Sequence, residues 1–503
     1  MNDPSVGSEA EPRRSQWSDR LGQWNPQLLR ELRGMNRKLM GVAAAVSFLA
    51  SLLLVCTVSL QALEPALKTS AYGSILSLSR MMWMLVLAVA GASLAKNWEK
   101  EARLGTLTFL RLSPEPAGRI LLGKLLGVPA PFFAAAVAWL PFHLFLTVKA
   151  GFSSMDWLVA DGFSVALAGM TLTGFLTLST LTERMNSVVG VVMAIALIPL
   201  IFSVFFGIAL GDGGEVYPNG LRWFGVDLVH SSNRLLIWGT GVVLAVTASL
   251  WQVAKRRFTL PHGTPLARRH AYQFMGLFNI LFLGFGLPIT DVSNWGVYGW
   301  AHLGQFWLLL QGLLLWGTMP NRQQLLDWAR YRHFHRHVHP QSGDRPPTAS
   351  PTGPTRQSPW HRLHPWIWHS GSPPFAVPLV NLAITVLIWS PWAIALGIAG
   401  NPIGLGTLVG WVSPTATFVA FAAFGVWLLL RHPRVCKGVL TGIVGIYGCL
   451  ILGAPAIGLF LVGWMGLASL AAAVGMVAIA QRTLQQMGAS ESQLLLNASS
   501  SSP

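Results

Sequence analysis

Charged residues are scarce in this 503-residue chain: Asp, Glu, Lys and Arg make up only 11% of it, against about 25% in soluble domains. Too few charges are present to cover the surface of a large soluble domain, so a soluble enzyme or binding protein is excluded as its main body. Hydrophobic residues make up 52%, and the 22 Trp fit aromatic belts at two membrane interfaces. We therefore expect an all-α, polytopic membrane helix bundle in the membrane lipid.

Cysteine is also scarce, and no secretory signal is recognisable. Cys56, Cys436 and Cys449 lie in or beside apolar runs, which excludes a disulfide framework. The first 38 residues are polar, and the apolar run after them is too long for a signal peptide. We expect that run to remain as a membrane span.

Apolar runs of roughly 17–25 residues predict about twelve transmembrane helices. They are 39–61, 76–95, 120–147, 157–181, 187–210, 235–254, 273–290, 301–319, 375–399, 407–430, 438–453 and 456–480. With both termini cytoplasmic, most Lys and Arg fall in cytoplasmic segments, as the positive-inside rule requires. The net charge of +16 is therefore a topology signal and predicts no nucleic-acid partner.

Composition divides the chain into segments. We expect a disordered N-terminus (1–24), a first membrane half (25–255), a basic cytoplasmic linker (256–272), a second membrane half (273–482) and a tail (483–503). The second half contains a cytoplasmic loop, 320–373, whose Pro- and Ser-rich centre at 340–359 is predicted to be disordered. Residues 211–233 form a predicted external loop.

A helix is predicted to begin at Asn25-Pro26, with Asn as the N-cap and Pro at the first helical position. Its leucines fall on one face and its charges largely elsewhere, which predicts an amphipathic helix lying in the membrane interface. A plain cytoplasmic helix would show the same pattern.

The most patterned polar stretch of the first half is Lys96–Gly127, between two predicted spans. It opens with a charged turn, continues through Gly105-Thr106 to an apolar edge, and is ended by prolines. Lys124 re-enters the apolar region and is expected to extend back to the cytoplasmic interface.

This stretch resembles the loop after the second span in ABC-2 type ABC-transporter permeases, and the resemblance covers residues 25–255. The matching pattern consists of Glu101, Gly105, Thr106, Leu107, Leu110, Ser113, Pro114, Gly123 and Lys124. The segment at Asn25 is similar to the interfacial helix of these permeases. The resemblance implies a coupling helix at about 97–113 that docks on a separate ATP-binding subunit. It implies partner contacts by Glu101, Arg103, Gly105, Thr106, Leu107, Phe109, Leu110, Ser113 and Pro114.

The family implies an ATP-driven transporter subunit, an exporter, in a bacterial inner membrane. No cofactor is expected, because Gly118–Leu125 nearly forms a nucleotide-binding G-x-x-x-x-G-K-[ST] motif but has Leu125 in place of the hydroxyl residue. Residues 321–330 hold the matching place in the second half without the Gly-Thr pattern. Either that half is a diverged second permease half, so that one chain supplies both membrane domains, or it is an added module on a six-span permease that dimerises.

Two other functions are considered. An ion-driven secondary transporter fits twelve spans, but such proteins use buried ionisable residues, and only His143 and Asp161 stand out inside spans, without evident partners. A membrane enzyme needs clustered acid–base groups, and only the His-rich tract 331–339 is a candidate. That tract could bind zinc or nickel if extended, but no carboxylate or Cys closely flanks it. We expect a basic interfacial segment next to a span and no metal site.

Overall fold

The computed structural model is mostly helical and divides into two compact units. One unit comprises Met1–Gly220 with Leu228–Pro261, and the other Leu221–Asp227 with His262–Pro503. The structure describes residues 16–35, 37–60, 65–181, 222–228, 232–286, 307–308, 310–337, 366–398, 411–431 and 466–500. The predicted spans 187–210 and 438–453, and the predicted disordered centre 340–359, lie outside these residues.

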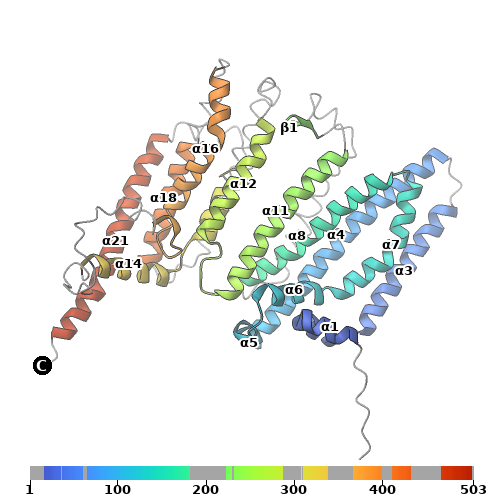
Figure 1. Ribbon diagram of the computed structural model, residues 1–503, viewed down its shortest axis with the longest axis horizontal. Coiled ribbons are helices and arrows are strands. Elements are labelled where there is room, and N and C mark those ends of the chain that lie inside the picture. The colour runs from blue at the N-terminus through green and yellow to red at the C-terminus, as the bar shows by residue number, and fades with distance from the viewer. Residues whose placement is uncertain are drawn as a thin grey trace, which may run out of the picture. The chain divides into compact units, whose positions relative to one another are not determined.

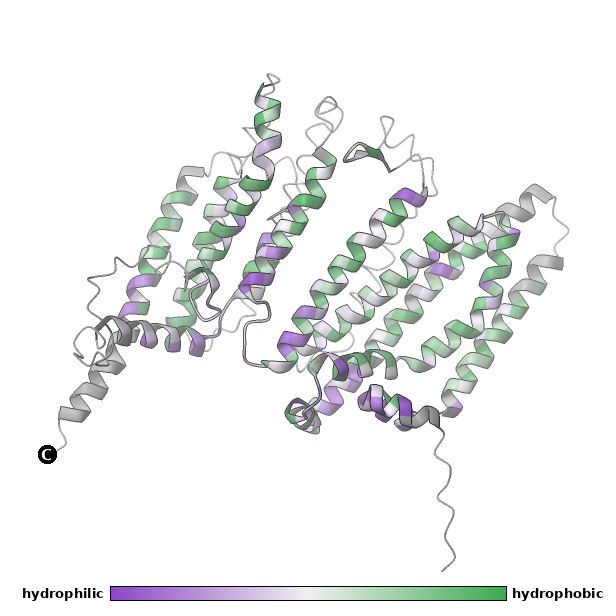
Figure 2. Ribbon diagram, viewed as in Figure 1, coloured by the Kyte–Doolittle hydropathy of each residue, from purple (hydrophilic) through white to green (hydrophobic). Residues whose placement is uncertain are grey.

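Five described helices are long and apolar enough to cross a membrane: Ala130–Lys149, Ser154–Leu181, Asn233–Thr259, Ala376–Ile398 and Pro414–Arg431. Each overlaps a span predicted from the sequence, so the expectation of a helical, polytopic membrane protein is confirmed. Figure 2 shows hydrophobic residues along the long helices and hydrophilic ones gathered on short helices and helix ends.

Nine helices of the first unit are described (Figure 1). They are α1 (Gln16–Trp24), α2 (Pro26–Gly34), α3 (Arg37–Leu60), α4 (Pro65–Arg103), α5 (Thr106–Leu112), α6 (Ala117–Gly127), α7 (Ala130–Lys149), α8 (Ser154–Leu181) and α11 (Ser232–Thr259). Helix α8 packs along α11 and α4, while α3 packs along α7. The short helix α2 packs across α6.

The core of this bundle depends on close approach of helices. Phe163 and Leu167 of α8 are fully buried together with Ala88 of α4. Gly91 of α4 lies against the ring of Phe175, since a Cβ at this glycine would lie only 2.1 Å from that ring. Small residues at such contacts allow transmembrane helices to pack tightly without a hydrophobic driving force.

Three boundaries in the first unit differ from those predicted. Residues 16–24 form α1, so the disorder predicted for 1–24 is wrong there. The predicted span 120–147 is broken at Val128-Pro129, because proline lacks the amide hydrogen that would continue α6 and instead starts α7. The predicted coupling helix 97–113 consists of the end of α4, a turn at Leu104-Gly105, and α5.

The described helices of the second unit are α12 (Arg268–Gly286), α14 (Arg322–His337), α16 (Ala376–Ile398), α18 (Val412–Arg431) and α21 (Gly466–Ser500), besides short helical segments at 307–308, 310–318 and 366–368. Helix α12 packs on α16, α18 packs on α21, and α14 lies across α21. Strands β1 (Arg222–Trp223) and β2 (Val226–Asp227) form a small antiparallel hairpin. Helix α21 continues without a break through the predicted boundary at 482.

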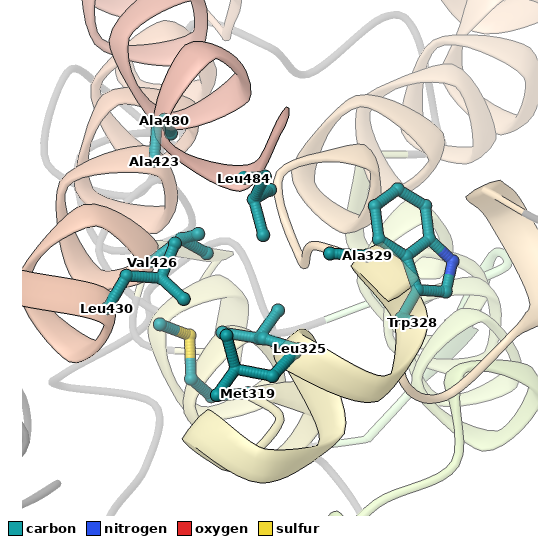
Figure 3. Packing of buried hydrophobic residues seen from close by; sticks show 10 residues of the cluster. Met319, Leu325, Trp328, Ala329, Ala423, Val426, Leu430, Ala480 and Leu484 are labelled. Atoms are coloured by element: carbon teal, nitrogen blue, oxygen red, sulfur yellow. The ribbon is translucent and has the colours of Figure 1, made fainter. Parts of the chain in front are cut away.

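The contact of α14 with α18 and α21 is apolar (Figure 3). Leu325 of α14 is fully buried there, next to Val426 of α18 and Leu484 of α21. Helix α14 has low overall hydrophobicity and is strongly basic, so this buried face is what holds it to the bundle.

The α2–α6 contact gives a testable prediction. A Cβ at Gly123 would lie 2.7 Å from the backbone nitrogen of Leu28, whereas a Cβ at Gly118 on the same helix meets only Lys255 Cε at 3.8 Å. Gly123→Ala should destabilise the protein by about 1–3 kcal/mol through overpacking. Gly118→Ala should be neutral or stabilising by up to about 1 kcal/mol, because alanine favours helix.

The measurement is thermal unfolding of both variants in detergent, with limited proteolysis of the α1–α2 region. Equal melting temperatures for Gly123→Ala and Gly118→Ala would contradict the close α2–α6 contact.

Candidate functional site

The Lys96–Gly127 stretch is built around a sharp turn between two helices. Helix α4 continues to Arg103, well past its apolar part, and Gly105 then takes a left-handed backbone conformation with φ of 72°. Glycine adopts this conformation without a steric penalty. The Thr106 hydroxyl donates a hydrogen bond to the Glu101 carbonyl at 3.2 Å, which fixes α5 to the end of α4.

Helix α5 has two different faces. Leu107 and Leu110 are buried in a cluster with Trp98 of α4, Leu121 of α6 and Phe258 of α11. Ser113 ends the helix by donating its hydroxyl to the Leu110 carbonyl at 2.9 Å. Helix α5 is therefore attached to the membrane helices through one face only.

The opposite face of the turn and helix is exposed. Phe109 and Leu112 are 75% and 81% exposed, and Leu104 in the turn is 66% exposed. Arg103 points outward beside them and pairs with Glu99 one helical turn earlier. We call Leu104, Phe109 and Leu112 the α5 patch.

An ionic group, the Lys124 cluster, surrounds the buried Lys124 of α6; it is formed with Glu31 and the half-exposed Arg30 of α2 and with Asn97 and Glu101 of α4. The ammonium of Lys124 has no exposed surface and lies 2.6 Å from Glu101 Oε2. It also donates hydrogen bonds to Glu31 Oε1 at 3.3 Å and Asn97 Oδ1 at 3.1 Å. The other oxygen of Glu101 lies 3.3 Å from Arg30 Nη2.

Two cations and two carboxylates leave this cluster formally neutral, which is the condition for burying charges at tolerable cost. The cluster joins α2, α4 and α6, which are separate in sequence. The N-cap adds a further tie: Asn25 accepts from the Leu28 amide at 2.9 Å and donates to the Arg119 carbonyl at 2.8 Å. The helix start predicted at Asn25-Pro26 is confirmed.

The residues singled out from the sequence therefore differ in where they lie. Glu101, Leu107 and Leu110 are buried inside the protein. Arg103 and Phe109 are exposed, Gly105 and Thr106 shape the turn, and Ser113 and Pro114 follow the end of α5. Lys124 does not extend to the interface as expected, because its counter-charges lie within the protein.

Sequence reasoning missed Glu31, Arg30 and Asn97 as members of the cluster. They lie on α2 and α4, at 93, 94 and 27 residues from Lys124 along the chain, so no local spacing relates them. The available signal was the lysine itself, since an ionisable residue next to apolar runs needs a partner.

A second ionic group, the His143 triad, lies within the first-unit helices. Asp161 of α8 accepts from Arg80 of α4 at 3.1 Å and faces His143 Nε2 of α7 at 2.9 Å. The expectation that His143 and Asp161 lack partners is wrong, because the bundle brings three helices together at this level.

In the second unit, polar groups join the helices and the segments next to them. Asn279 of α12 donates to the Thr385 hydroxyl of α16 at 3.1 Å and accepts from the Trp389 indole at 3.0 Å. Arg268 donates to the carbonyls of Trp366, Ser372 and Pro373. Burial lowers the pKa of Arg268 to about 10, so it remains protonated at neutral pH.

The His-rich tract begins inside α14, which extends to His337, and its remainder lies outside the described residues. Alternating residues do not share one face of a helix. Within the part of the chain that the structure describes, no three His, Cys, Asp or Glu side chains are grouped to hold a metal ion.

Comparisons with protein-family models, curated proteins and solved structures found no match to this chain.

The Lys124 cluster leads to a prediction on stability. Lys124→Met removes the cation that Glu101 and Glu31 share and leaves the half-exposed Arg30 as the remaining counter-charge in the cluster, which should cost about 3–5 kcal/mol. Arg119→Met is the matched control on the same helix, because the Arg119–Glu115 pair is half-exposed and surface pairs contribute about 0–1 kcal/mol.

Unfolding midpoints of the purified variants provide the measurement. Adding Glu101→Gln to Lys124→Met should restore part of the loss, since it removes one of the two carboxylates that have lost their shared lysine. A Lys124→Met protein as stable as Arg119→Met would contradict a buried, charged cluster.

Proposed function

We propose that this chain is the membrane-spanning subunit of an ATP-driven ABC transporter of the ABC-2 type. ATP is bound and hydrolysed on a separate subunit, which docks on the α5 patch. The chain has about twelve spans with both termini cytoplasmic, resides in the bacterial inner membrane, and acts as an exporter.

The observation that carries this proposal is the exposed apolar patch on a rigidly supported helix. Phe109 and Leu112 are largely exposed, while Leu107 and Leu110 on the other face are buried in the bundle. Monomeric soluble surfaces seldom present several large apolar side chains together unless a partner covers them. Aromatic and aliphatic anchors of this kind carry most of the binding energy in protein interfaces.

The charged surroundings of the patch favour a protein partner over lipid. Glu99, Lys100 and Arg103 precede it, and Arg111, Glu115 and Arg119 follow or flank it. An apolar centre with a mixed polar rim is the usual composition of a protein–protein interface.

The support of the patch indicates how force would pass into the membrane. Helix α4 contains 39 residues, about 58 Å at 1.5 Å per residue, so it is longer than the hydrocarbon core of a bilayer. A displacement of α5 reaches α4 through Thr106 and the Leu107–Leu110 face, and reaches α2 and α6 through the Lys124 cluster. Rigid elements that shift between discrete packings are the ordinary means of such switching.

The proposal is tested by purifying the tagged chain from its native membrane in mild detergent. An ATP-binding protein that carries its own nucleotide motif should accompany it at fixed stoichiometry. Transport in vesicles made with both proteins should require ATP. The same stoichiometry decides whether one chain supplies both membrane halves or two chains associate.

An ion-driven secondary transporter is the second candidate, and the His143 triad is the observation that favours it. Buried ionisable groups within membrane helices form proton relays in such transporters. Vesicle transport that needs a proton gradient and no ATP would establish this candidate and overturn the first.

Docking on the α5 patch gives a specific prediction. Phe109→Ala with Leu112→Ala should weaken capture of the ATP-binding subunit at least ~10-fold, equivalent to about 1.4 kcal/mol of binding free energy. Val137→Ala with Val148→Ala is the matched control, because these α7 side chains are similarly exposed, at 69% and 75%.

Amounts of chain in the membrane and melting temperatures should be unchanged in both double variants, which separates docking from folding. Arg103→Ala should cause a smaller loss of capture of the subunit. The more strongly wild-type capture depends on salt, the larger this loss should be. Full retention of the subunit by the Phe109→Ala, Leu112→Ala protein would refute docking at this patch.

A further inference from the structure

The His143 triad lies well inside the bundle. His143 is six residues from the Lys149 end of α7, and Asp161 is seven residues from the Ser154 end of α8. At 1.5 Å per residue these are depths of about 9 and 10 Å. Arg80 is 4% exposed, and His143 is 8% exposed.

The carboxylate of Asp161 is the centre of the triad. Its Oδ1 accepts from Arg80 Nη2 at 3.1 Å, and His143 Nε2 lies 3.1 Å from Oδ1 and 2.9 Å from Oδ2. The side chain of Asp161 retains 22% exposure, whereas that of Arg80 has 5%. Arg80 and Asp161 neutralise each other, so the triad is formally neutral as long as His143 is uncharged.

We propose that the triad is a proton-binding site, in which uptake of one proton by His143 strengthens the tie between α7 and α8. Imidazole is the side chain that ordinarily changes charge between pH 5 and 8. With Nε2 facing Asp161, the incoming proton from the aqueous phase binds Nδ1, for which the described residues provide no hydrogen-bond partner. Proton uptake at Nδ1 breaks no existing hydrogen bond, and the net charge of the triad rises from zero to +1.

Proton uptake changes the strength of the contact as well as its charge. The neutral imidazole donates an ordinary hydrogen bond to Asp161, whereas the imidazolium donates a charge-assisted one, which is about twice as strong. The surroundings increase this difference, because Phe142 and Leu146 of α7 pack with Tyr72 and Leu76 of α4 in an apolar cluster. A low local dielectric makes each charge interaction larger than in water.

Other charged groups on the neighbouring helices lie away from the triad in sequence. On α7, Lys149 lies over the Phe145 ring at 5.9 Å; on α8, Asp156 accepts from Ser153 and Asn233. Three helices packed around the triad carry further titratable or charged groups with described side chains. They are Tyr72, Lys96, Glu99, Lys100, Glu101 and Arg103 on α4, Lys38 and Cys56 on α3, and Arg234, Lys255, Arg256 and Arg257 on α11. Asp161 forms ion pairs with Arg80 at 3.1 Å and with His143 at 2.9 Å.

This proposal does not depend on ATP as the energy source, since it concerns proton binding by the membrane helices themselves. An ATP-driven transporter with such a site would respond to pH, and an ion-driven one would use the site for coupling. Measurements on His143 can therefore refute proton binding while docking on the α5 patch is confirmed. Equally, docking can be refuted while proton binding is confirmed.

The decisive variant is His143→Gln, which keeps a hydrogen-bond donor for Asp161 but cannot take up a proton. The melting temperature of the wild type relative to His143→Gln should be higher at pH 5.5 than at pH 8 by about 1 °C or more, since the shift for a given gain in stability becomes smaller as the chain becomes longer. His262→Gln is the control, because His262 is exposed and lies outside the triad.

A direct measurement uses the wild-type chain with isotope-labelled histidine. The nitrogen resonances of one buried imidazole should report protonation of Nδ1 as the pH falls from 8 to 5, and that signal should be missing in His143→Gln.

If His143→Gln does not accumulate, Asp161→Asn tests the same link, since the imidazolium then lacks its carboxylate and the gain in melting temperature at pH 5.5 should disappear. Two results would overturn the proposal and show that the triad is a fixed structural contact. One is a melting-temperature difference between wild type and variant that is the same at both pH values or larger at pH 8. The other is a His143 signal that does not change between pH 8 and pH 5.

Discussion

A lysine with no exposed surface needs its counter-charges within the protein, and this requirement organises the first unit. Lys124 lies between Glu101 of α4 and Glu31 of α2, so its burial fixes the positions of three helices at once. Gly123, one residue earlier, allows the backbone of α2 to approach closely enough for these contacts. Because Lys124 is shared by Glu31 and Glu101, removing it takes a counter-charge from both carboxylates at once.

The burial of Lys124 also determines how firmly the helix that carries the α5 patch is held. A short helix attached through one apolar face would be free to rock if α4 ended before it. Here α4 extends past its apolar part as a continuous helix, and the cluster attaches its end to α2 and α6. A partner that binds Phe109 and Leu112 would therefore act on four helices, which is the arrangement that a force-transmitting interface requires.

The His143 triad shows the corresponding solution deeper in the bundle, with one carboxylate shared by two potential cations. The two ionic groups differ in what they can do. Lys124 is paired with carboxylates from two helices and has no exposure, so it serves as a permanent tie. His143 shares the Asp161 carboxylate with Arg80, and the proposed proton uptake concerns this contact.

The sequence by itself determined the membrane class, the helical architecture, the helix start at Asn25-Pro26 and the Gly105 turn, because these depend on local composition and on backbone preferences. It also identified the stretch on which α5 lies. Only the tertiary structure decided which face of α5 is exposed, that Glu101 points inward, and that Arg80, His143 and Asp161 meet. Ionic contacts between helices depend on how those helices rotate and pack, and no spacing along one chain specifies that.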